Sequence, residues 1–131
     1  MLRKFEEEVF VHYRTGVPEM DRQHWDVLQI LVNVAECQNI ESAVEQLDLF
    51  MTKWKAHLDD EEAYMKRLKF PFLVEHKKMH ENLFSEYAQM KTTMRNDRFG
   101  DISLRNYAKS ALKKVLDHID HHDQQYAHWK P

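Results

Sequence analysis

Apolar residues recur at every third or fourth position along four segments of the chain, which is the spacing of one face of an α-helix. This pattern predicts helices over residues 19–37, 41–67, 72–95 and 103–127. In the first segment the apolar face consists of Val27, Leu28, Leu31, Val32, Val34 and Ala35. Each predicted helix is long enough to present several turns to a shared core, so the pattern favours a bundle.

The breaks between these segments carry residues that end or start helices. Pro18 precedes the first segment, and a proline is tolerated in the first helical turn because its missing N–H has no partner there. Pro71 separates the second and third segments, and Gly100 lies in the turn before the fourth. Because short loops join antiparallel neighbours, we predict an all-α, up-down-up-down four-helix bundle over residues 19–127.

Residues 1–18 lack sustained helical periodicity. They include three aromatic residues, Phe5, Phe10 and Tyr13, and end at Gly16-Val17-Pro18. We interpret this segment as an N-terminal arm that packs across the bundle through its aromatic side chains.

Composition is that of one ordinary globular domain spanning residues 1–131. Hydrophobic residues make up 43% and charged residues 31%, with only two glycines and three prolines. The net charge of −3 and the scattered lysines and arginines argue against a nucleic-acid partner and against membrane insertion. A single cysteine, Cys37, and the lack of an apolar signal region lead us to expect a cytoplasmic protein.

Candidate metal ligands fall on all four predicted helices. His57 and Glu61 are four residues apart, as are His76 and His80, so each pair projects from one helix face. A single histidine, His24, lies on the first helix. Burying several imidazoles and carboxylates together costs several kcal/mol each unless a cation neutralises them. The sequence therefore predicts a metal centre inside the bundle.

The fourth helix is less clear because three histidines and an aspartate crowd together. His118 and His122 lie about 40° apart around a regular helix, whereas His118 and Asp123 lie about 140° apart. Spacing alone favours the first pair but does not exclude the second. The remaining histidines, His121 and His128 among them, are interpreted as surface residues.

With these residues the chain resembles the bacteriohemerythrins of the hemerythrin family over nearly its whole length. The matching segments are Asp21-Arg22-Gln23-His24, His57-Leu58-Asp59-Asp60-Glu61-Glu62-Ala63-Tyr64-Met65, His76-Lys77-Lys78-Met79-His80, and His118-Ile119 followed by Asp123. The family pattern on the fourth helix is His-x4-Asp, which selects His118 and Asp123 as ligands.

The resemblance implies a non-haem centre of two iron ions bridged by an oxo or hydroxo group. One iron would take three histidines and the other two, with both carboxylates bridging. The two-histidine iron would keep an open position for reversible O2 binding. The implied ligands are His24, His57, Glu61, His76, His80, His118 and Asp123.

The function implied is therefore that of a non-enzymatic O2 carrier, store or supplier, with an oxygen-consuming protein as recipient. Two other readings stay open: an O2 or redox sensor working through a partner protein, and a di-iron enzyme acting on peroxide or nitric oxide. Four apolar residues beside the ligands are candidates for lining an O2 pocket: Val27, Leu58, Val115 and Ile119.

One position departs from the family pattern. Members commonly carry Trp-Leu at the fourth and third positions before the histidine of the last helix, where this chain has Lys114-Val115. A lysine lacks the apolar bulk of an indole, so sealing of the pocket depends on another residue. Trp54, one turn before His57, is a candidate, although core packing is the preferred interpretation of this residue.

Overall fold

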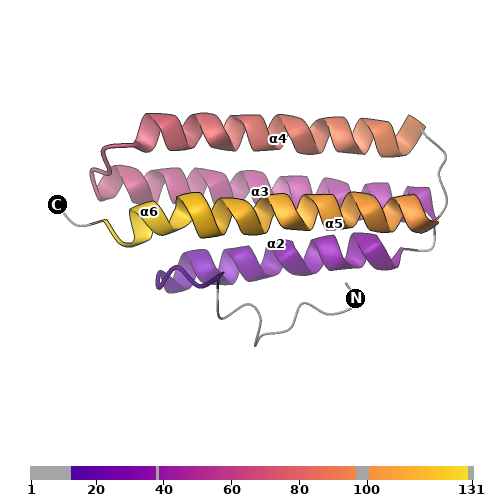
Figure 1. Cartoon of the computed structure of the whole chain (residues 1–131), viewed down its shortest axis with the longest axis horizontal. Coiled ribbons are helices and arrows are strands. Elements are labelled where there is room, and N and C mark those ends of the chain that lie inside the picture. Colours follow the sequence, from indigo (N-terminus) through magenta and orange to yellow (C-terminus); the bar gives the residue numbers. More distant parts are fainter. Residues whose placement is uncertain (1–12, 38, 97–100, 130–131) are drawn as a thin grey trace.

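Four helices lie side by side and successive helices run in opposite directions in the computed structural model (Figure 1). The structure describes residues 13–37, 39–96 and 101–129. The helices are α2 (Pro18–Glu36), α3 (Ile40–Arg67), α4 (Leu73–Asn96) and α5 (Asp101–His118), and α5 continues into η2 (Ile119–Asp123) and α6 (Gln124–Ala127). Both α2 and α4 pack against α3 and α5. The predicted all-α four-helix bundle is confirmed.

Local residue chemistry explains where the helices begin and end. Pro18 occupies the first position of α2, and the Asn39 side chain caps α3 by accepting a 2.8 Å hydrogen bond from the Ser42 N–H. After α3, Lys69 adopts a positive φ of 57°, which reverses the chain before Pro71. As a result, the helices begin and end within a few residues of the predicted positions.

The main core fills the space between α2, α3 and α5. Its largest members are Phe50, Trp54 and Tyr87, whose rings contact one another at centroid distances of 5.0–6.1 Å. Tyr13 packs against this core, as predicted for the arm, whereas Phe5 and Phe10 lie outside the described residues. On α4 only Tyr87 is fully buried among the predicted apolar residues, so this helix contributes least to the core.

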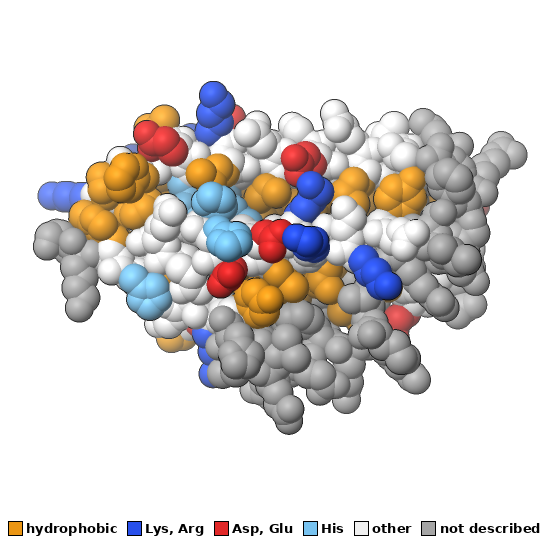
Figure 2. Space-filling view, in the orientation of Figure 1, with side chains coloured by type: hydrophobic (Ala, Val, Ile, Leu, Met, Phe, Trp, Pro, Cys, Tyr) orange, Lys and Arg blue, Asp and Glu red, His pale blue; other side chains and the backbone are white. Residues whose placement is uncertain are grey.

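A second, smaller core closes one end of the bundle. It joins Met20 of α2, Met65 of α3 and Tyr126 of α6 to Phe70 of the loop between α3 and α4. Figure 2 shows apolar side chains at the surface of this same end, where α3 leads into α4. None of the described helices is both long and apolar enough to cross a membrane.

The last helix corrects one prediction. A single helix was expected over 103–127, but residues Ile119–Asp123 form a π-helical turn within it. A π turn closes its hydrogen bonds over five residues instead of four, so it inserts one extra residue into the helix. Such an insertion is rare and has no periodic signature in the sequence.

Candidate metal centre

Seven side chains from all parts of the bundle meet between the two cores. They come from α2 (His24), α3 (His57, Glu61), α4 (His76, His80), the end of α5 (His118) and the end of η2 (Asp123). Each is at most 3% exposed. The i,i+4 pairs on α3 and α4 project inward because each shares a face with apolar core residues of its helix. The structure thus brings together all seven residues singled out in the sequence.

These residues form two overlapping groups in which every ligand atom lies within 4.8 Å of the others. One group contains three histidines, His76, His80 and His118, and the other contains two, His24 and His57. Glu61 and Asp123 belong to both groups. The arrangement therefore offers two adjacent cation positions that share two carboxylates.

The π turn is what places Asp123 at the centre. In a regular helix, residues five apart point about 140° away from each other. With one residue looped out, His118 and Asp123 face the same way, and His118 Nε2 lies 3.0 Å from Asp123 Oδ1. His122 belongs to neither group, although its ring centroid lies 5.4 Å from that of His118.

Unpartnered polar atoms show that these residues fit a cation. Among the described residues, His24 Nε2, His57 Nε2, Glu61 Oε1 and Asp123 Oδ2 are buried without a hydrogen-bond partner. Isolated buried groups of this kind cost roughly 1–3 kcal/mol each. A cation that accepts their lone pairs removes that cost, and mixed imidazole and carboxylate ligands suit a transition metal such as iron.

The comparisons with known proteins agree with this geometry. The model of the hemerythrin HHE cation-binding domain matches residues 15–129. The chain belongs to the hemerythrin family. Neither the curated proteins nor the solved structures include a significant match to this hemerythrin.

Electrostatics in the cation-free centre favour ionised carboxylates and protonation of His24 and His76, whereas burial lowers the pKa of His57. Burial alone lowers the pKa of His24, but the carboxylates of Asp123 and Glu61, 3.2 and 3.5 Å from its Nε2, outweigh that effect and raise the pKa to about 9. His76 behaves in the same way, with a pKa of about 9. Burial alone would raise the pKa of Glu61, yet the surrounding imidazoles hold it well below its usual value. In the absence of metal, protons on His24 and His76 therefore supply part of the positive charge that the two carboxylates attract.

Two ligands are oriented by polar partners on their outer side. The Nδ1–H of His57 donates to Gln23 Oε1 at 2.7 Å, and that of His80 donates to Glu62 Oε2 at 3.0 Å. Because Nδ1 carries the proton, Nε2 of each ring is left free to face the centre. Glu62, whose side chain is 21% exposed, thus supports a candidate ligand without being one itself.

Tyr126 contacts the shared carboxylate directly and was also missed by sequence reasoning. Its hydroxyl donates a 2.8 Å hydrogen bond to Glu61 Oε2, and both residues are fully buried. Burial and the nearby charge of Glu61 raise the pKa of Tyr126, so the phenol stays protonated. Neither this residue nor Gln23 belongs to a spaced pair of ligand types, so the sequence offered no signal for their roles.

Trp54 occupies the space between two ligand helices in this hemerythrin. Its indole is fully buried, and its ring centroid lies 5.4 Å from that of His57 and 6.4 Å from that of His118. Lys114 points away from the core, since its Nζ lies 3.0 Å from Glu86 Oε2 on α4. Trp54 on α3 thus supplies apolar bulk beside the centre that Lys114 does not.

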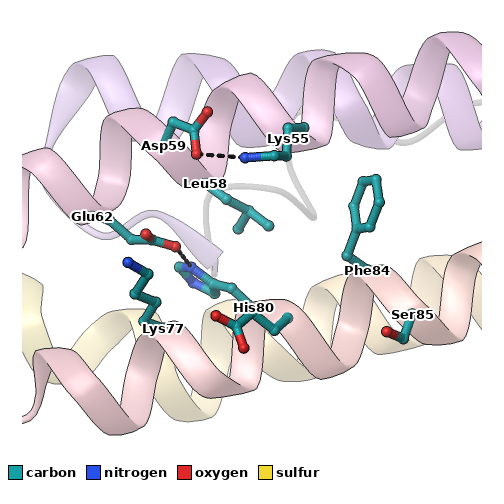
Figure 3. A pocket seen from close by; sticks show the side chains of 9 residues that line it. Lys55, Leu58, Asp59, Glu62, Lys77, His80, Phe84 and Ser85 are labelled. Carbon is teal, nitrogen blue, oxygen red and sulfur yellow. Dashed lines mark hydrogen bonds and ion pairs between the residues drawn. The ribbon is translucent and has the colours of Figure 1, made fainter.

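A pocket of about 410 Å³ lies between α3 and α4 and reaches the outer edge of His80 (Figure 3). Leu58 and Phe84 form its apolar surface, and charged side chains such as Lys55 surround it. It approaches the three-histidine group, whereas the predicted open position belongs to the group of His24 and His57. This pocket is therefore distinct from the predicted O2 pocket.

Of the four residues predicted to line that O2 pocket, all are buried in the main core, and Leu58 also lines the pocket of Figure 3. Val27, Val115 and Ile119 are at most 1% exposed. An apolar surface therefore adjoins the centre on several helices, and its role in holding O2 stays a prediction.

Proposed function

We propose that this hemerythrin holds two iron ions in the seven-residue centre and binds O2 reversibly, as a carrier, store or supplier and not as an enzyme. The observation that carries the proposal is the pair of overlapping ligand groups that share two buried carboxylates. The three-histidine group provides one more nitrogen than the other. The two-histidine position is therefore the one left with room for an external ligand.

The iron pair supplies the electrons and the open coordination position that O2 binding requires. The protein supplies five imidazoles that are neutral when coordinated and only two carboxylates. Ferritin-like di-iron centres use four carboxylates and two histidines. Fewer anionic ligands stabilise oxidised iron less strongly, so this ligand set favours release of O2 over its use in oxidation.

The surrounding side chains exclude water from the centre. Every candidate ligand is at most 3% exposed, and Trp54 fills the space beside His57 and His118. Exclusion of water and protons would let an iron pair held here release O2 without remaining oxidised. We propose that Val27, Leu58, Val115 and Ile119 complete the dry surface.

The test combines metal analysis with repeated oxygenation. Protein produced in iron-replete cells should contain two irons per chain. The reduced protein should gain a visible absorption band on exposure to O2 and lose it when O2 is removed, over several cycles. His57→Gln should abolish the cycle, whereas His121→Gln, which changes an exposed histidine in η2, should leave it intact.

Other outcomes assign other functions. A metal content near one, or zinc in place of iron, refutes the di-iron proposal. Steady consumption of peroxide or nitric oxide with a reductant present identifies an enzyme instead. Uptake of O2 that changes binding to a partner protein, without efficient release, identifies a sensor.

A further inference from the structure

The end of the bundle where α3 leads into α4 exposes apolar side chains that the rest of the fold leaves uncovered. Phe72 is 56% exposed and Val74 is 78% exposed, and Pro71 beside them is also exposed. We call these three residues and the cations around them the end surface. Figure 2 shows apolar and cationic side chains at this end of the molecule.

Positive side chains outnumber negative ones near these apolar residues. Five exposed cations lie within eight positions of Phe72 in the sequence: Lys66, Arg67, Lys69, Lys77 and Lys78. None of them forms an ion pair with a described residue. Elsewhere in the described part of the chain, four lysines on the sides of the helices do, as in the 2.7 Å contact of Lys91 with Asp48, whereas Lys53 and Lys109 do not. The protein carries a net charge of −3, so the excess of positive charge at this end is opposite in sign to the charge of the whole chain.

Aromatic contacts lead from the end surface to the metal centre. The ring of Phe72 meets that of Phe70 at a centroid distance of 5.8 Å, and Phe70 meets the candidate ligand His76 at 6.5 Å. Phe70 is 5% exposed, so it separates solvent from the ligand. A molecule seated on Phe72 would therefore lie two ring contacts from the centre.

We propose that the end surface docks an acidic electron-carrier protein that returns oxidised iron to its O2-binding ferrous state. The inference rests on the proposed function, because a carrier that oxidises accidentally needs a reductant. In each encounter the reduced carrier loses one electron and one ferric ion becomes ferrous, so two encounters reduce the pair. No bond within the protein forms or breaks.

The composition of the end surface matches this occupant. Electron-transfer complexes bury small interfaces and dissociate readily, and a charged rim speeds encounter without requiring high affinity. Three exposed apolar residues with five cations fit that description. The exposed carboxylate of Glu75 lies next to Val74 and opposes an acidic protein and an anionic membrane alike, so binding to vesicles is measured as a separate outcome.

The experiment measures binding of the iron-loaded protein to an acidic plant-type [2Fe–2S] ferredoxin by calorimetry, at low salt and at about 0.15 M salt. The double variant Lys69→Glu/Lys77→Glu reverses two cations of the end surface and is called the rim variant. The double variant Lys53→Glu/Lys109→Glu reverses two exposed cations on the flanks of α3 and α5 and is the matched control. The rim variant should bind roughly tenfold more weakly than the control, and added salt should weaken binding of the unaltered protein.

A second comparison tests the apolar part of the end surface. Phe72→Ala should weaken ferredoxin binding by roughly tenfold. Leu49→Ala, which truncates another exposed apolar residue, should not. The rate at which reduced ferredoxin reduces the oxidised iron, followed by stopped-flow absorbance, should fall in the same variants and in no control.

Equal binding by rim variant and control, or no salt-sensitive binding at all, overturns the inference. So does binding confined to vesicles of phosphatidylcholine with phosphatidylglycerol, which would identify a membrane surface. Reduction that proceeds equally fast in all variants also overturns it. Because ferredoxin binding is measured separately from O2 uptake, failure of the proposed function and failure of docking give different results.

Discussion

Removing the Tyr126 hydroxyl tests how far the centre depends on a residue that is not a ligand. Tyr126→Phe deletes one oxygen atom and with it the 2.8 Å hydrogen bond to Glu61 Oε2. Both groups are fully buried, so water does not replace the lost donor. A hydrogen bond to a charged acceptor contributes about 1.5–3 kcal/mol, and we expect the free energy of unfolding to fall by that amount.

For a chain of this size, such a loss corresponds to a fall in melting temperature of roughly 5–15 °C. Iron binding should also weaken, since removing a hydrogen-bond partner of a ligand typically costs about 10–100-fold in metal affinity. Thermal unfolding followed by circular dichroism measures the first effect, and competition with an iron chelator measures the second. Because the pKa of Tyr126 is raised, both effects should be constant between about pH 6 and 9.

Tyr64 provides the matched control. Its ring packs against that of Tyr126 at a centroid distance of 5.8 Å, but it is only partly buried and does not contact Glu61. Tyr64→Phe should change the unfolding free energy by less than about 0.5 kcal/mol. If Tyr126→Phe and Tyr64→Phe have the same melting temperature and the same iron affinity, the hydrogen bond to Glu61 does not support the centre.

Three further predictions concern the centre itself. Asp123→Asn should lose iron while His122→Ala keeps it, as measured by metal analysis; the opposite result would show that the ligand on the last helix is misassigned. Deleting the exposed residue His121 should convert the π turn into a regular helix and preserve iron binding, whereas a deletion earlier in α5 should abolish it; loss of iron in both would refute this role of the π turn. The iron-free protein should lose several kcal/mol of stability as pH rises from about 6.5 to 9, because the raised pKa values of His24 and His76 mean that the folded state binds more protons. Urea unfolding at several pH values checks this, and the iron-loaded protein, whose imidazoles hold metal instead of protons, should show no such loss.

Much of the bundle could be predicted from the sequence because its signals are local. Apolar residues at helical spacing, Pro18, Asn39 and Pro71 act within one or two turns of the chain, and the structure places helix boundaries close to them. The pairs His57/Glu61 and His76/His80 are local as well, since an i,i+4 spacing fixes a shared face whatever the tertiary packing. Once the helices were predicted to pack side by side and antiparallel, these two pairs could be expected to face one another inside the bundle.

Features that depend on contacts between helices could not be predicted in this way. Gln23, Glu62 and Tyr126 gain their roles from residues 18 to 65 positions away in the chain, and each is an ordinary polar residue in its own segment. The position of Trp54 is similar, because its contacts with His118 on α5 and the turning of Lys114 toward Glu86 on α4 both depend on how the helices pack.

The last helix separates the two kinds of information most clearly. By spacing alone, His122 was a better partner for His118 than Asp123, and only resemblance to a family favoured the aspartate. The structure brings Asp123 inward through a π turn, a strained local geometry that regular propensity opposes. Tertiary packing decided that Asp123 and not His122 faces the centre, because placing a shared carboxylate among imidazoles offsets the cost of the irregular turn.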